Sequence, residues 1–380
     1  MRKQKTQNQV GIPQLARRIN LKAVTRQMRR MEVFSKIGLA EKSGISNTTM
    51  SKLFNQLENN QLIERSLMED KSFGRPKILY QLSSTLQVAA VFVDVDETTI
   101  CISDLLGKIK AENTARFPTP DNAETFFTVV SEEYFKLCGR INASCRIIGI
   151  CIPGLIESET GNSVFCPNLH WLENHAPADE IEKQTNTPTL IMQEEQALCR
   201  AQFPAADEST NYIAIDFSSG VGMSAVSNGE HLAGNSGFAG EIGHIIVDPN
   251  GKTCGCGNRG CLETIASDRV FLSETGLPID DALERLREQH PPVLEAARKV
   301  LHAQAIGIAT AINILNPQKV FVYSRLNEAC PDYLQKLREA VKERTISFSF
   351  ENCSIEATSE GKLKGALLLT IDRLLETATA

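Results

Sequence analysis

The sequence predicts an α/β protein in which a basic helical segment precedes a larger acidic body. Its 380 residues exceed what one compact core of ordinary size accommodates, so two or three domains are expected. Apolar residues recur at helical spacing up to about residue 59, and from about residue 88 onward apolar strands alternate with helical stretches. These patterns predict helices first and an α/β architecture after them.

Charge divides the chain in the same place. Residues 1 to 85 contain sixteen Lys or Arg and six Asp or Glu, a net charge of +10, whereas the remaining residues contain 24 and 40, a net charge of −16. A basic head on an acidic body indicates a nucleic-acid-binding module joined to a different function.

The composition excludes several other classes of protein. Apolar residues make up 42% and charged residues 23%, as in soluble globular proteins. No apolar run is long enough to cross a bilayer, so no membrane partner is expected, and the N-terminus MRKQKTQNQV lacks the apolar core of a signal peptide. We therefore expect a cytoplasmic protein, in which eleven cysteines indicate reduced thiols and a metal site.

The head contains three expected helices. Helical spacing of apolar residues predicts the first over 15–34, and a second short helix fits 35–42. Gly44 supplies a turn, and Ser46 is a suitable N-cap for a third helix over 47–59. The intervals between the small, glycine and apolar residues are those of a helix-turn-helix.

The exposed face of the third helix carries short polar side chains and a lysine, which suit DNA phosphates and base edges. A β-ribbon after Leu62, with Ile78 to Tyr80 as its return strand, would complete a winged helix-turn-helix. A generic three-helix bundle with a solvated polar face is the alternative. The DNA-contact candidates are Ser46, Asn47, Thr48, Thr49, Ser51, Lys52, Asn55 and, at the ribbon tip, Arg75.

The acidic body alternates strands and helices. Two strands surround a tight turn at Asp94 to Thr98. The elements that follow are a helix over about 121–140, a strand over 147–152, a strand-to-helix turn near Glu194, a glycine-containing loop over 218–224, a helix over 306–313, a strand over 320–322 and an amphipathic helix over 361–375.

A short stretch of the body has the density of ligands that metal sites show. Cys254, Cys256 and Cys261 lie within eight residues, and His244 lies ten residues before the first of them. Three thiolates and one imidazole form a closed tetrahedral set that suits structural Zn²⁺. The alternative is a glycine-rich surface loop with incidental cysteines.

This stretch resembles the signature of the ROK family (repressors, open reading frames, kinases), a GEIGH box followed by CxCGxxGCxE; the Gly-Arg-Pro ribbon tip is also typical of the family's repressors. The resemblance implies zinc bound by the histidine and three cysteines, and sugar contacts from Glu241, His244 and Glu263. The run ending in PNLHW adds Asn168, and Glu194 falls on the position of the family's general-base Asp.

The resemblance also implies the architecture. A winged helix-turn-helix (1–85) would precede a two-lobed actin-like, ribonuclease-H-like ATPase-type fold with a zinc loop. The first lobe would span 86–202 and the second 203–380, with the C-terminal helix packing back on the first lobe.

Three loops depart from the nucleotide-binding pattern of the family's kinases. Carboxylates replace the glycines in Asp94 to Thr98, only two of the glycines remain in Ser218 to Ser224, and Tyr323 to Arg325 replaces a glycine-rich strand end. Acidic or bulky side chains there oppose the close approach of phosphate to the backbone, so no ATP and no catalytic residue is expected. Glu in place of Asp at 194 likewise favours binding over catalysis.

The sequence therefore predicts a repressor of carbohydrate genes that binds operator DNA as a homodimer or homotetramer and responds to a sugar or sugar phosphate between its lobes. Two alternatives stay open. One is an ATP-dependent, glucokinase-like sugar kinase with an accessory DNA-binding domain. The other is a repressor controlled by a protein partner such as a sugar-transport component.

Overall fold

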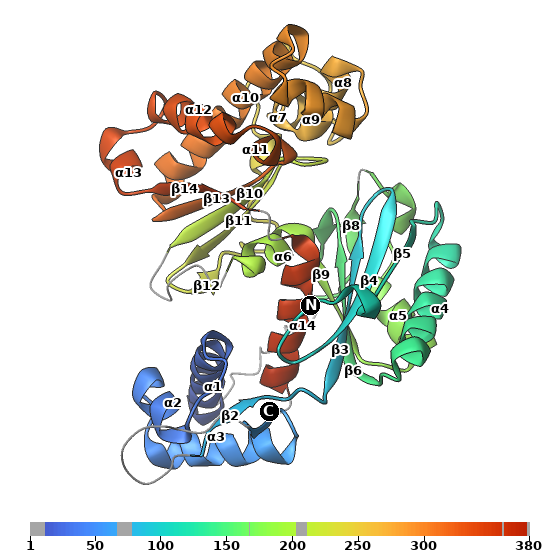
Figure 1. Cartoon of the computed structure of the whole chain (residues 1–380), viewed down its shortest axis with the longest axis vertical. Helices are drawn as coiled ribbons and strands as arrows, with labels where there is room; N and C mark the ends of the chain where they lie inside the picture. The colour runs from blue at the N-terminus through green and yellow to red at the C-terminus, as the bar shows by residue number, and fades with distance from the viewer. Residues whose placement is uncertain (1–11, 67–77, 167, 203–210, 359–360, 378–380) are drawn as a thin grey trace, which may run out of the picture.

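The computed structural model describes residues 12–66, 78–166, 168–202, 211–358 and 361–377 (Figure 1). Within them the chain forms a small head and two α/β lobes, each built on a five-stranded sheet. Figure 1 shows the head at one end, beside α14 and the first lobe. None of the described helices is both long and apolar enough to cross a membrane.

The head consists of three helices and a two-stranded ribbon. These are α1 (Ile12–Arg30), α2 (Lys36–Ser43), α3 (Asn47–Asn59), β1 (Ile63–Arg65) and β2 (Tyr80–Leu82). The ribbon is antiparallel. The candidate Arg75 lies in 67–77, outside the described residues.

Local signals explain where the head helices begin and end. Ser35 accepts a hydrogen bond from the backbone N–H of Gly38 and starts α2, while Gly44, with φ 66°, ends it. Ser46 caps α3, which spans the residues expected. The return strand begins at Tyr80 and not at Ile78: Tyr80 pairs with Arg65 of β1, and its backbone also pairs with that of Phe34.

The first lobe is built on a sheet in the order β5-β4-β3-β6-β9. Alternate residues of β3 face opposite sides, so Ala89 and Val91 pack under α4 and α5, whereas Val88 and Ala90 pack toward α14 and the head. The bounds are β3 (Gln87–Val93), β4 (Glu97–Asp104), η1 (Ala111–Asn113), β5 (Thr114–Pro118), α4 (Ala123–Ile141), β6 (Cys145–Ile152), β7 (Leu155–Ile156), β8 (Ser163–Phe165), η2 (His170–Leu172), α5 (Pro177–Thr185), β9 (Thr189–Gln193) and α6 (Glu194–Ala201).

The second lobe is built on a sheet in the order β12-β11-β10-β13-β14, and its largest core lies between this sheet and the helices that cover one face. The bounds are β10 (Tyr212–Asp216), β11 (Gly222–Ser227), β12 (Glu230–His231), η4 (Ile242–His244), α7 (Glu263–Ala266), α8 (Asp268–Thr275), α9 (Ile279–Arg287), α10 (Pro291–Leu315), β13 (Lys319–Tyr323), α11 (Arg325–Ala329), α12 (Pro331–Lys342), α13 (Ser347–Glu351), β14 (Ser354–Ala357) and α14 (Lys362–Thr377).

Two helices, α6 and α14, lie between the sheets and carry the chain from one lobe to the other (Figure 1). Leu198 and Cys199 of α6 pack against the second sheet, while Leu367 of α14 belongs to the core shared by the first lobe and the head. A Cβ at Gly365 would collide with the backbone of Ala197, so this glycine permits the close approach of the two helices. The C-terminal helix therefore packs against the first lobe.

Candidate functional site

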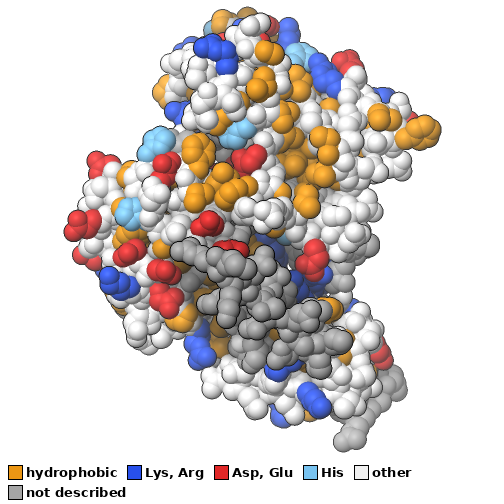
Figure 2. Space-filling model, turned by 180° about the vertical axis from the view of Figure 1, so that it is seen from behind, with side chains coloured by type: hydrophobic (Ala, Val, Ile, Leu, Met, Phe, Trp, Pro, Cys, Tyr) orange, Lys and Arg blue, Asp and Glu red, His pale blue; other side chains and the backbone are white. Residues whose placement is uncertain are grey.

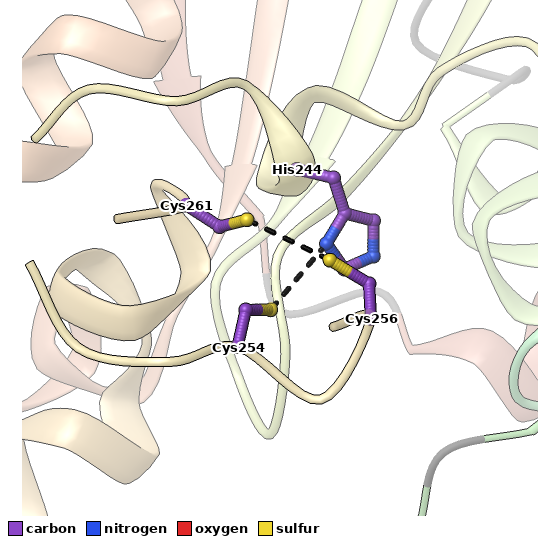
Figure 3. Close-up of side chains that lie close together, drawn as sticks. All are labelled: His244, Cys254, Cys256 and Cys261. Atoms are coloured by element: carbon purple, nitrogen blue, oxygen red, sulfur yellow. Dashed lines mark hydrogen bonds between the residues drawn. The ribbon is translucent and has the colours of Figure 1, made fainter. Parts of the chain in front are cut away.

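Three cysteines and a histidine from the second lobe converge in one loop (Figure 3). The short helix η4 presents His244, and the turn closed by the bond from Gly257 N–H to the carbonyl of Cys254, 3.0 Å, brings the sulfurs together. Gly260, with φ 75°, has no room for a Cβ beside the backbone of Asp248. The ligand atoms of all four residues lie within 4.8 Å of one another.

The spacing of these atoms fits a tetrahedral metal ion. Two sulfurs each about 2.3 Å from a tetrahedral zinc ion lie about 3.8 Å apart. The Sγ atoms of Cys256 and Cys261 are 3.7 Å apart, and Cys254 Sγ is 3.6 Å from His244 Nδ1. The group can therefore hold a metal ion, and its three sulfurs and one nitrogen are a donor set that zinc prefers.

A polar pocket of about 70 Å³ lies between the two lobes, next to the Cys–His group. We call it the acidic pocket, because six of its lining side chains are carboxylates. All five sugar-contact candidates line it. The residues that carry its polar side chains are Asp94, Asn168, Glu194, Glu195, Asp216, Ser219, Glu241, His244 and Glu263.

His244 joins the acidic pocket to the metal-type group. Its Nδ1 faces Cys254, while its Nε2 lies 3.7 Å from a carboxylate oxygen of Glu241. Burial raises the pKa of Glu241. A metal ion on one ring nitrogen would fix the other as a hydrogen-bond donor toward the pocket.

Glu263 and Asn168 are held by contacts at the edge of the pocket. Glu263 begins α7, and its carboxylate accepts a hydrogen bond of 3.0 Å from the backbone N–H of Val221. Asn168 of the first lobe accepts a bond of 3.1 Å from Arg269 of the second lobe. This bond spans the two lobes beside the pocket.

Lys362 and Asp216, which were not foreseen, form ion pairs at the pocket residue Glu194. Lys362 Nζ lies 2.7 Å from Glu194 Oε2 and 2.5 Å from Asp216 Oδ2. Burial acts to lower the pKa of Lys362, but Asp216 and Glu194 outweigh it and raise that pKa well above its usual value. Asp216 ends the buried strand β10, a placement readable in the sequence, whereas nothing in the KLKG segment distinguishes Lys362 from Lys364.

The DNA-contact candidates in the described residues belong to α3 and its N-cap. Leu53, Phe54 and their neighbours form the buried stripe of α3, and the candidates are exposed or half-buried on its other faces. Three of these side chains form local bonds: Ser46 Oγ accepts from the N–H of Thr49 and is hydrogen-bonded to Thr49 Oγ1, and Ser51 Oγ donates to the carbonyl of Asn47. Asn47, Thr48, Lys52 and Asn55 remain exposed to solvent.

The fold and this site define a two-lobed α/β protein with a Cys₃His loop beside a polar pocket between the lobes. The chain belongs to the ROK family, whose model matches residues 88–371. It is 27% identical to the xylose repressor of Bacillus subtilis over 384 residues, which cover 96% of this chain and 97% of that protein. It is 26% identical to the transcriptional dual regulator NagC of Escherichia coli, over 90% of this chain and 88% of that protein.

The solved structures that share the mixed α/β fold include a regulator and a kinase. One is a ROK family transcriptional regulator described as a homologue of the Escherichia coli MLC protein, with a TM-score of 0.79, 23% identity, and coverage of 96% of this chain and 98% of that one. The other is a ROK family glucokinase from Streptomyces griseus, with a TM-score of 0.66, 20% identity, and coverage of 75% and 98%. The first therefore matches the head as well as the body, whereas the second matches a shorter part of the chain.

Proposed function

We propose that this protein is a sugar-responsive transcriptional repressor of carbohydrate uptake or catabolism genes. The observation that carries the proposal is the convergence of Asn168, Glu194, Glu241, His244 and Glu263 around one pocket between the lobes. Carboxylates and an oriented imidazole are suited to the vicinal hydroxyls of a sugar. Similarity to proteins named xylose repressor and NagC along nearly the whole chain supports the regulatory assignment.

The head is proposed to be a winged helix-turn-helix that binds operator DNA through α3. Its capped helices, the ribbon that follows them and its charge support this. Figure 2 shows Asp and Glu side chains gathered on one flank of the body, while the charged side chains visible at the end that carries the head are mainly Lys and Arg. One recognition helix makes few base contacts, so a homodimer or homotetramer is proposed to supply paired heads.

Zinc is proposed as the structural metal of the Cys₃His group. With four protein ligands it has no open position for chemistry. Its part would be to fix the ring of His244 beside Glu241 and to brace the loop that lines the pocket.

A structural change at the pocket could reach the DNA-binding head through α1, because this helix of the head contacts both lobes. On the side of the first lobe, Arg29 Nε is 3.1 Å from Asp372 of α14, the helix that packs against that lobe. The other carboxylate oxygen of Asp372 lies 2.6 Å from Arg200 Nε. Arg200 belongs to α6, the helix that begins at Glu194 in the pocket. A shift of α6 on ligand binding would therefore reach Arg29 through one shared carboxylate.

On the second lobe, α1 contacts the hairpin of β11 and β12. Lys22 and Arg26 lie 3.2 and 3.0 Å from the carboxylate oxygens of Glu230. A change in the angle between the lobes would move the contact of α1 with Asp372 relative to its contacts with Glu230. We propose that the sugar changes the orientation of the head in this way, to the extent that it binds one lobe arrangement more tightly.

A sugar kinase is the second candidate, since structures that share the fold include a glucokinase. The strand end at Tyr323 to Arg325 argues against it. Ser324 donates a hydrogen bond of 2.7 Å to the buried Asp268, whose other oxygen accepts one of the same length from Arg325 N–H. A packed polar cluster thus occupies the segment where the kinases carry glycines, which supports a protein that binds no ATP.

The experiment is operator binding by the purified chain at one stated salt concentration, with a panel of sugars and sugar phosphates. Specific binding to DNA upstream of carbohydrate genes, weakened by one sugar, is expected. Turnover of ATP with a sugar would establish the kinase instead. Specific DNA binding that no sugar alters, but that a sugar-transport protein relieves, would place control in a protein partner.

A further inference from the structure

Lys362 lies where α6 and α14, the two helices that run between the lobes, come together. It is the first residue of α14, and Glu194 is the first residue of α6. Lys362 also contacts Asp216, the last residue of β10 in the second lobe. Nζ of Lys362 is within hydrogen-bond distance of one carboxylate oxygen of each partner, at 2.7 and 2.5 Å.

Two of these three charged groups are buried, and the side chain of Glu194 is 18% exposed. Lys362 is 8% exposed and Asp216 is 3% exposed. The Lys362 ammonium also lies 5.9 Å from the centre of the Phe92 ring. A buried charge is tolerated only when it is paired, so one ammonium serves as the counter-ion of two carboxylates from different lobes.

We propose that Lys362 is the positioning residue of the sugar site: it aims the carboxylate of Glu194 into the acidic pocket and ties it to Asp216 of the second lobe. The inference rests on the proposed function, because it requires that a sugar binds beside Glu194. A sugar hydroxyl that bonds to Glu194 then acts directly on the Lys362–Glu194 ion pair. The arrangement of the two lobes depends on this pair, because Lys362 also binds Asp216.

The chemistry of the pocket makes the ammonium necessary. A glutamate has three rotatable side-chain bonds, and without a partner its carboxylate would turn away from Asp216 and from the neighbouring Asp94. With Lys362 in place, one oxygen of Glu194 is occupied and the other keeps a defined direction. Removing the ammonium leaves carboxylates that must take up another cation or protons.

The test is Lys362→Ala in the full chain, with the sugar that wild-type protein binds in calorimetry. Loss of a charge-assisted contact that orients Glu194 is expected to weaken sugar binding by at least about tenfold. Methylammonium, which fits the space the shortened side chain leaves, is expected to restore part of the affinity. The wild-type protein should show no such response to methylammonium.

Lys364→Ala is the matched control. Lys364 lies on the same helix, but its ammonium contacts the carbonyl of Gly107 in the first lobe and not the pocket. Its substitution is expected to leave the sugar affinity unchanged. Thermal unfolding of both variants separates loss of affinity from loss of folded protein.

The outcomes distinguish the two proposals. If wild-type protein binds no sugar, the proposed function fails. If wild-type protein binds a sugar and folded Lys362→Ala binds it equally well, the positioning role is overturned while the function stands. If neither Lys362→Ala nor Lys362→Met folds, Asp216→Asn decides, because it releases Lys362 from the second lobe, and an unchanged sugar affinity in that variant overturns the inference.

Discussion

Replacing Asp372 by Asn tests the junction between the head and the body. The side chains of Arg29 and Arg200 are only 6% and 12% exposed, and both share this carboxylate. Asn keeps the shape but removes the negative charge that the two buried guanidinium groups share. Removing one partner of a buried ion pair costs about 3–5 kcal/mol. Because Asp372 retains 22% exposure, we expect about 3 kcal/mol, the lower end of that range.

The assay is thermal unfolding of the full chain, followed by a signal that reports the head and first lobe. That loss corresponds to a fall in Tm of about 6–12 °C for a cooperative unit of 150–250 residues. Glu230→Gln is the matched control, because the side chain of Glu230 is 61% exposed and surface pairs contribute about 0–1 kcal/mol. A Tm for Asp372→Asn no lower than that of Glu230→Gln would refute the reasoning.

The stabilisation that Asp372 provides should depend on pH, and its direction follows from the pKa of this carboxyl. Burial acts to raise the pKa of Asp372, but Arg200 and Arg29 outweigh it and lower that pKa. A carboxylate with a depressed folded-state pKa stabilises the protein above its unfolded pKa of about 3.9, and the contribution is lost as the pH falls through the folded-state pKa. The difference in stability between wild type and Asp372→Asn should therefore be constant near neutrality and shrink only in acid.

Further predictions address the metal, the DNA, the ligand and a buried acid. Cys256→Ser should lower the zinc content and blunt the sugar response; unchanged zinc stoichiometry would remove Cys256 from the ligand set. Lys52→Ala should reduce the slope of log affinity for operator against log salt by about one if Lys52 contacts a phosphate; an unaltered slope and affinity would exclude it. Six carboxylates around the pocket should make a sugar phosphate bind at least about tenfold more weakly than its parent sugar, and equal affinities in calorimetry would contradict this. Burial raises the pKa of Asp268 to about 7, so its ionisation destabilises the fold as the pH rises from about 4 toward 7, and Asp268→Asn should flatten that decrease in the free energy of unfolding.

Local signals in the sequence predicted the elements that depend on local physics. Ser46 as a cap and the apolar stripe beginning at Met50 placed α3 at its observed bounds, because capping and periodicity act within one helix. The group of His244 and three cysteines was predictable because its four members lie within eighteen residues, His244 to Cys261. The return strand begins two residues later than predicted, since its bounds are set by pairing with β1, a separate segment of the chain.

Contacts between distant parts of the chain could not be read in the same way. Lys362 lies 168 residues from Glu194, and Arg29 lies 343 residues from Asp372. Lys, Glu, Arg and Asp usually lie on the surface of a protein. These four are shielded from solvent only because α14 packs between the lobes. The sequence therefore predicted that Glu194 lies in the pocket. It did not predict the ion pair of Glu194 with Lys362.

Both buried ion clusters lie where parts of the protein meet, and α6 joins them. It begins with Glu194 in the lobe–lobe cluster and carries Arg200 in the head–body cluster, and a helix of its eight residues is about 12 Å long. Buried ion pairs are weak sources of stability compared with apolar packing, but they lose most of their energy when their geometry changes. Charges at these two places therefore favour one defined arrangement of head and lobes over neighbouring ones. In the proposed repressor, that property allows a small ligand beside Glu194 to act on the helix that positions the head.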